Sequence, residues 1–230
     1  MAIPVIMKVA GAAQALPPLA ALRFGRRLPA ARRWIVGWGL VRLLDDGIAL
    51  ALALQGRHNL WLRYPFGPLE TALLLVALSL WHGDSVARLA LRVAVPVFAL
   101  TWSLLVGFVE RTDTFGLVTG PLQSLVVLSA ALVTLLVRVR SQEGGLLQED
   151  WFWVCTGLSL WYGSSAALEP LSRLLVAEHP SVVSSAYQVK AVVDVLASLI
   201  LARGMLCPIL PLLRPSGGPS PQESSPLRYS

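Results

Sequence analysis

The sequence predicts an all-α fold, a polytopic membrane helix bundle of seven transmembrane helices, and three observations lead to this prediction. Hydrophobic residues make up 55% of the 230 residues, charged residues make up only 14%, and the mean hydropathy is +0.65. Soluble domains carry roughly 25% charged residues, so this chain has too few charges to cover a surface that faces water. One span takes about 20 mostly apolar residues, so the length allows roughly seven spans with short loops.

Apolar runs bounded by charges, proline and glycine place the spans along the chain. The first run, 2–22, is weakened by Lys8, Gln14 and the pair Pro17 and Pro18, and six spans are the alternative if it lies at the interface. The other spans are 34–55, a third that ends at Trp81, about 90–109, 115–137, 151–168 and about 182–207. Residues 1–207 are therefore the expected bundle. The segment 208–230, rich in Pro, Gly and Ser, is the expected disordered cytoplasmic tail.

The start of the third span decides the depth of Glu70. A start near Leu60 places Glu70 at the middle of the membrane. A start at Pro68 places it in the first turn near the outside, where proline followed by an acidic residue suits a helix N-terminus. We favour the start at Pro68, which leaves residues 57–59 and 63–65 in an external loop.

Arginines predict the orientation, with the N-terminus outside and the C-terminus in the cytoplasm. In this topology the cytoplasmic segments hold twelve arginines and the external segments hold four, in agreement with the positive-inside rule. The twelve are Arg23, Arg26, Arg27, Arg32, Arg33, Arg88, Arg92, Arg138, Arg140, Arg203, Arg214 and Arg228, and the four are Arg57, Arg63, Arg111 and Arg173. We therefore assign the net charge of +6 to insertion in a bilayer, with a bacterial inner (plasma) membrane as the expected location, and expect no nucleic-acid partner.

Tryptophans divide into two groups by depth. The first group lies at predicted span ends, where an indole favours the membrane interface: Trp34, Trp61, Trp81, Trp151 and Trp153. The second group lies deeper and is expected to pack inside the bundle: Trp38, Trp102 and Trp161.

Two spans carry charges at the depth where a charge is most unfavourable. A charge at the bilayer centre costs about 2.5–3.5 kcal/mol on insertion scales, and such residues usually face the bundle interior. The span 34–55 contains Arg42, Asp45 and Asp46, and the four-residue spacing of Arg42 and Asp46 places them on one helix face. The span 182–207 contains Lys190 and Asp194, also four apart.

The two charged groups are expected to meet in an intramembrane charge network, because they lie at similar depth on antiparallel helices. Asp45 has no local partner, and Lys190 is the natural residue to bridge toward it. Tyr187 extends the polar stripe of the last span. The candidate ligand- or proton-binding residues are Arg42, Asp45, Asp46, Glu70, Tyr187, Lys190 and Asp194. The alternative is that the ion pairs only set the register of the helices.

Three classes of function fit this pattern. We favour a receptor-like, sensory or accessory protein that binds a small ligand, a lipid or a membrane-protein partner inside the bundle, because the short loops leave no soluble catalytic domain. A small proton- or ion-coupled transporter is the first alternative, although the sequence has no internal repeat and no matched helix breaks. An intramembrane lipid-modifying enzyme is the second, with carboxylates as acid and base, but no nucleophile accompanies them and no catalytic residue is assigned.

Cofactors and metals are not expected. Neither a P-loop nor a dinucleotide fingerprint is present, and Cys155 and Cys207 lie in or next to apolar stretches outside any Cys/His cluster, so they should pack as small hydrophobic residues. Lys190 in the last span also resembles the chromophore-binding lysine of seven-helix retinal proteins. That resemblance covers only the span count and this lysine, and Asp194 one turn later can neutralise the ammonium instead.

Overall fold

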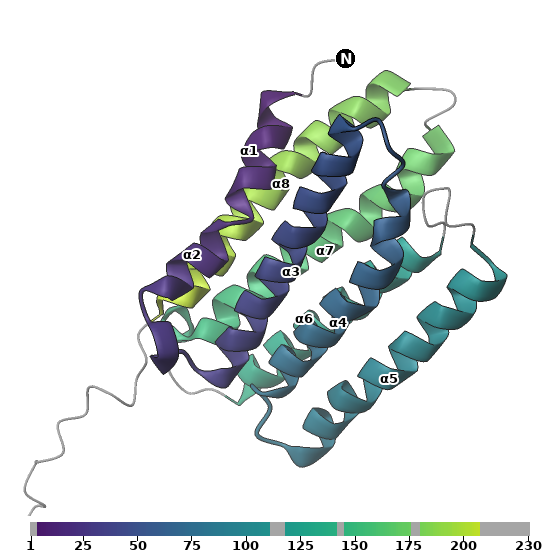
Figure 1. The fold of residues 1–230 in the computed structure, drawn as a ribbon. Coiled ribbons are helices and arrows are strands. Elements are labelled where there is room, and N and C mark those ends of the chain that lie inside the picture. Colours follow the sequence, from purple (N-terminus) through teal and green to yellow (C-terminus); the bar gives the residue numbers. More distant parts are fainter. Residues whose placement is uncertain (1–3, 111–117, 142–144, 176–179, 208–230) are drawn as a thin grey trace, which may run out of the picture.

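The computed structural model describes residues 4–110, 118–141, 145–175 and 180–207, and within these ranges every regular element is a helix (Figure 1). The α-helices are α1 (Val5–Ala13), α2 (Leu16–Leu22), α3 (Ala30–Leu54), α4 (Arg63–Ser79), α5 (Ser85–Phe108), α6 (Thr119–Arg140), α7 (Asp150–Leu175) and α8 (Pro180–Leu206). Three short 3₁₀ turns, Gly25–Arg27, Leu60–Leu62 and Leu146–Gln148, lie between them. The predicted all-α fold is confirmed for these ranges, and the predicted tail at 208–230 lies outside them.

The first apolar segment is a broken helix. α1 ends at Ala13 and α2 begins at Leu16, with its proline pair in the first turn. Pro17 and Pro18 have no N–H to bond to the preceding turn, but they are tolerated where a helix begins. The break at Gln14 and Ala15 therefore follows from the proline pair, and α1 and α2 together count as one of seven helical rods.

Three of these rods are long and apolar enough to cross a membrane: Val5–Leu22, Ser85–Phe108 and Thr119–Arg140. Only 11% of the apolar window of α5 is buried within the protein, and large hydrophobic side chains such as Leu100 and Phe108 are exposed on it. A water-facing helix would not present such a surface, whereas hydrocarbon favours it. The protein is therefore membrane-associated through these helices. α3, α7 and α8 are equally long and carry the polar residues described below.

Helices α7 and α8 form the closest pair of the bundle, because small residues lie between them. A Cβ atom on Gly157 of α7 would lie 2.7 Å from the side chain of Leu201 and 3.1 Å from the carbonyl oxygen of Ala197 on α8. Such small residues let two helix backbones approach closely in a membrane. α6 packs on the other side of α7. α5 lies at one edge of the bundle and α1 and α2 at the other, beside α8 (Figure 1).

A buried arginine closes the end of the bundle at which α3 and α7 begin and α8 ends, which we call the Arg32 end. The Nε atom of Arg32 donates to Asp150 at 2.7 Å, and one terminal nitrogen donates to the carbonyl oxygens of Met205 and Cys207 at 3.3 and 2.7 Å. These carbonyls lie at the C-terminus of α8, where backbone acceptors have no partner within the helix. Arg32 therefore joins three helices.

The tryptophans predicted to pack inside the bundle do so. Trp38, Trp102 and Trp161 are buried, as expected, and Trp34 and Trp61 are exposed at helix ends. Trp151 lies in the first turn of α7, at the predicted span end, and its side chain is buried against the bundle. Its neighbour Asp150 is held inside the bundle by Arg32, and the guanidinium of Arg138 lies 5.5 Å from the centre of the Trp151 ring. Cys155 and Cys207 are free and buried, as predicted.

Candidate functional site

A large cavity opens at the end of the bundle opposite the Arg32 end, which we call the cavity end. Its volume is about 730 Å³, and α1, α3, α4, α6, α7 and α8 all contribute to its wall. Asn59, Thr119 and Val183 line its outer part, near the helix ends. Arg42, Asp45 and Lys190 line its inner part, near the middle of α3 and α8. Charged side chains at mid-helix depth therefore face an open space.

Arg42 is the centre of one group of charges at the inner end of the cavity. Its guanidinium lies 3.4 Å from Glu70 of α4 and 3.9 Å from Asp46 of α3. The buried Glu70 also accepts a hydrogen bond from Gln123 of α6 at 3.4 Å. These distances are at the long end of the range for hydrogen bonds and ion pairs, so the guanidinium of Arg42 is held loosely.

The depth of Glu70 corrects the sequence prediction. α4 begins at Arg63 and continues through Pro68, so Glu70 lies inside the helix and not in its first turn. Pro68 has no N–H for the carbonyl four residues earlier, which belongs to Tyr64. The indole N–H of Trp102 on α5 donates to that carbonyl at 2.9 Å. A partner from another helix thus makes an internal proline acceptable here, and residues 63–65 are helical.

Lys190 pairs with its own helix. Its ammonium donates to both carboxylate oxygens of Asp194 at 2.7 and 2.8 Å and lies 5.7 Å from the centre of the Trp161 ring. The predicted bridge from Lys190 to Asp45 is therefore wrong. A carboxylate one turn away satisfies the ammonium without spanning the cavity. No hydrogen bond or ion pair joins Asp45 to another residue in the described ranges.

The seven predicted residues take two roles. Arg42, Asp45, Tyr187 and Lys190 line the cavity. Asp46, Glu70 and Asp194 are the ion-pair partners of the lining cations. Both charged helices thus contribute to one cavity, although no ion pair links the two groups directly.

Further polar residues line the cavity that the sequence did not single out: Asn59, Arg63, Tyr162, Ser165 and Glu169. Arg63 was placed in a loop, and Glu169 lies beyond the predicted end of the sixth span at 168. α7 continues through Pro170. The spacing of Tyr162, Ser165 and Glu169 places them on one helix face. This spacing could have predicted that α7 extends beyond residue 168.

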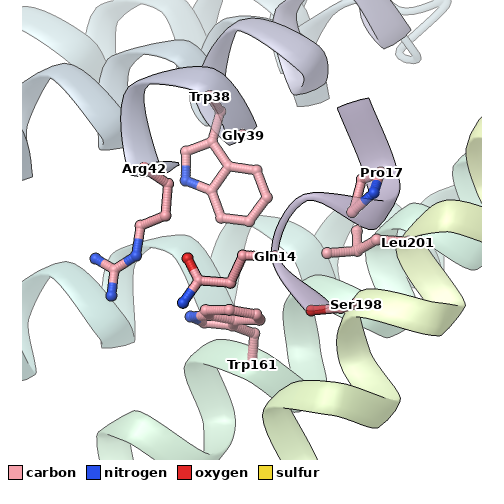
Figure 2. Close-up of a pocket in the computed structure, with 8 residues that line it drawn as sticks. All are labelled: Gln14, Pro17, Trp38, Gly39, Arg42, Trp161, Ser198 and Leu201. Carbon is pink, nitrogen blue, oxygen red and sulfur yellow. The ribbon is translucent and has the colours of Figure 1, made fainter. Parts of the chain in front are cut away.

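A second, much smaller cavity lies where the first helical rod is broken (Figure 2). Its volume is about 10 Å³, and Gln14, Trp38, Arg42 and Trp161 are among the side chains that line it. The Gln14 Oε1, Trp38 Nε1 and Arg42 Nε atoms are buried without a hydrogen-bond partner among the described residues. A space of this size suits one water molecule. A water would accept from the two N–H groups and donate to the amide oxygen.

No protein-family model matches the chain, and neither the curated proteins nor the solved structures contain a significant match to it. What the protein does must therefore follow from its own geometry.

Proposed function

We propose that all seven rods span the membrane, with the N-terminus and the cavity end outside and the Arg32 end in the cytoplasm. The arginine distribution supports this orientation, and the length of α3, α7 and α8 supports their crossing. A reporter fused to the C-terminus would test it. We expect activity of a cytoplasm-specific reporter and none of a reporter that needs export, and the reverse result would contradict the orientation.

We further propose that the protein is a receptor-like, sensory or accessory membrane protein that binds a small molecule or lipid in the cavity of about 730 Å³. Small-molecule sites occupy roughly 300–1,000 Å³, with a mostly apolar wall and a few convergent polar groups. The observation that carries the proposal is the convergence of Arg42, Asp45 and Lys190 on this cavity. Ionisable residues inside a membrane bundle are, as a default hypothesis, functional-site residues.

Packing supports ligand binding over a purely structural role for these charges. A structural ion pair gains most when its geometry is short and water is excluded, as at Arg32. The Arg42 pairs are long, and open space remains above them. Side chains packed into this space would stabilise the fold more than an open cavity does. The protein instead leaves polar groups accessible there.

Mass spectrometry of the purified protein tests the proposal. We expect a small molecule or lipid to co-purify with the native protein and to be lost from the variant Asp45→Asn. The matched control is Asp84→Asn, because Asp84 lies at the Arg32 end, far from the cavity. Equal retention by Asp45→Asn and the native protein would contradict a ligand site at this carboxylate.

The transporter remains the second candidate, and the break in the first rod favours it. Transporters bind their cargo beside interrupted helices, and Gln14 at the break lies in the small cavity together with Arg42 (Figure 2). Proton flux into proteoliposomes that is abolished by Asp45→Asn would support the transporter. Absence of flux in a preparation that binds ligand would support the receptor-like protein.

A further inference from the structure

Residues of α1 and of α3 both contribute to the wall of the cavity. Met7 of α1 and Ala49 of α3 both line it, yet α1 packs chiefly on α8, and it is α2 that packs on α3. We call the part of the wall between Met7 and Ala49 the seam. Apolar side chains are exposed on both helices, among them Val5 on α1 and Leu50 and Leu54 on α3. In the proposed topology these side chains would contact hydrocarbon, which would place the seam beside the outer lipid leaflet.

The wall of the cavity is amphipathic. Met7, Ala49, Leu60 and Leu62 form apolar parts of this wall, whereas Arg42, Asp45 and Lys190 lie in its inner half. Arg63, the first residue of α4, lies beside Leu62 in its outer half. A ligand that is polar throughout would leave the apolar part of this space poorly filled. A ligand with one polar end and one chain fits both parts, with its chain leaving through the seam into the bilayer.

Two opposite charges on the wall are left for the polar end. Lys190 and Arg42 are already neutralised by carboxylates that do not line the cavity. Asp45 and Arg63 both line the cavity, and Asp45 lies within electrostatic reach of Arg42 as well as of Arg63. Neither is ion-paired with a residue in the described ranges. A carboxylate and a guanidinium in this arrangement complement a headgroup that carries both an ammonium and a phosphate.

We propose that the cavity binds a single-chain zwitterionic amphiphile, with its ammonium on Asp45, its phosphate on Arg63 and its chain between α1 and α3. This inference rests on the proposed ligand-binding function and names the class of ligand. Entry through the seam would let such a ligand arrive from the bilayer without crossing the aqueous phase.

Titrations of the full chain in maltoside detergent, followed by native mass spectrometry, test the inference with three probes. Lysophosphatidylethanolamine carries both charges and one chain, phosphoethanolamine lacks the chain, and lysophosphatidylglycerol lacks the ammonium. We expect the first probe to bind at least tenfold more tightly than either of the others. Asp45→Asn should weaken its binding about tenfold, the change that loss of about 1.4 kcal/mol produces, and should leave lysophosphatidylglycerol unaffected.

The seam is tested by Ala49→Trp, which places an indole between α1 and α3. We expect it to weaken lysophosphatidylethanolamine binding at least tenfold and to leave phosphoethanolamine binding unchanged. The matched control is Leu100→Trp on the lipid-facing surface of α5, which should change neither. If Ala49→Trp fails to fold, Ala49→Leu gives a smaller obstruction of the same seam, with a smaller loss expected.

Different binding results would overturn the amphiphile proposal and the proposed ligand-binding function. Equal affinity for phosphoethanolamine and its lysolipid, or no effect of obstructing the seam, would overturn the amphiphile and keep a small polar ligand. Equal affinity for the two lysolipids would overturn the zwitterionic headgroup. Absence of binding by all three probes, together with no co-purifying species, would overturn both the inference and the proposed function.

Discussion

Buried charges are tightly paired at one end of the bundle and loosely paired toward the other. At the Arg32 end, one guanidinium makes a 2.7 Å contact with Asp150 and two further contacts with the C-terminus of α8. Toward the cavity end, Arg42 lies 3.4 and 3.9 Å from its carboxylates, beneath an open space of about 730 Å³. The first arrangement holds helices together. The second leaves charges facing open space, where we propose that a ligand binds.

Removing the arginine of the closed end should have the largest effect on stability. Arg32→Ala leaves Asp150 and two carbonyl oxygens without their partner, and breaking a buried ion pair costs about 3–5 kcal/mol. We expect a large fall in the midpoint of thermal unfolding in detergent. The midpoint should fall less for Asp150→Asn, which keeps a hydrogen-bond acceptor for Arg32. A loss under about 1 kcal/mol, typical of an exposed pair, would contradict the stabilising role of this end.

Near the cavity end, the largest stability effect should come from a hydrogen bond outside the charge groups. Trp102→Phe leaves the Tyr64 carbonyl beside Pro68 without its donor, and an unsatisfied buried acceptor costs about 1–3 kcal/mol. Thermal unfolding should show this loss. Trp34→Phe is the control, because its indole is exposed. Equal midpoints for the two variants would mean that α4 does not need the Trp102 contact.

The Arg32 end should also make stability depend on pH. Burial, followed by the nearby Arg138, lowers the pKa of His82 below its ordinary value, and His82 shares a 3.0 Å hydrogen bond with Thr134. The unfolded chain then binds a proton that the folded protein binds less readily. Stability should therefore be complete above about pH 6.5 and decrease as the pH falls below it. His82→Gln should flatten this part of the pH profile, and an unchanged profile would rule out His82 as the cause.

The smallest effect on stability should come from the cavity itself. Asp45→Asn removes a charge that makes no hydrogen bond or ion pair within the described ranges, so the unfolding midpoint should shift by no more than the equivalent of about 0.5 kcal/mol. The same variant should lose its ligand. A large destabilisation without loss of ligand would reverse the contrast between the two ends.

Local patterns were enough to predict the helices, the burial of the deep tryptophans and the grouping of charges on two spans. They failed where a distant residue decides the outcome. The helix continues through Pro68 because Trp102, on the next helix, takes over the Tyr64 carbonyl.

The candidate site was predictable in its residues and not in its shape. The spacing of Lys190 and Asp194 predicts that they share a face, and they do form an ion pair. The space between α3 and α8, which keeps Lys190 from Asp45, depends on how six helices pack. Spacing along one helix contains no information about such a space.

The most direct test of the account is whether the cavity faces the outside, which cysteine accessibility measures. Cys155 and Cys207 are buried, so an introduced cysteine can be read above a low background. Ser165→Cys lines the cavity, and Ser124→Cys on α6 is the matched control, because Ser124 is buried away from it. A membrane-impermeant thiol reagent should label Ser165→Cys from the outside and not from the cytoplasm, and should label Ser124→Cys from neither side. Labelling of Ser165→Cys from the cytoplasm alone, or equal labelling of both variants, would contradict an outward-facing cavity.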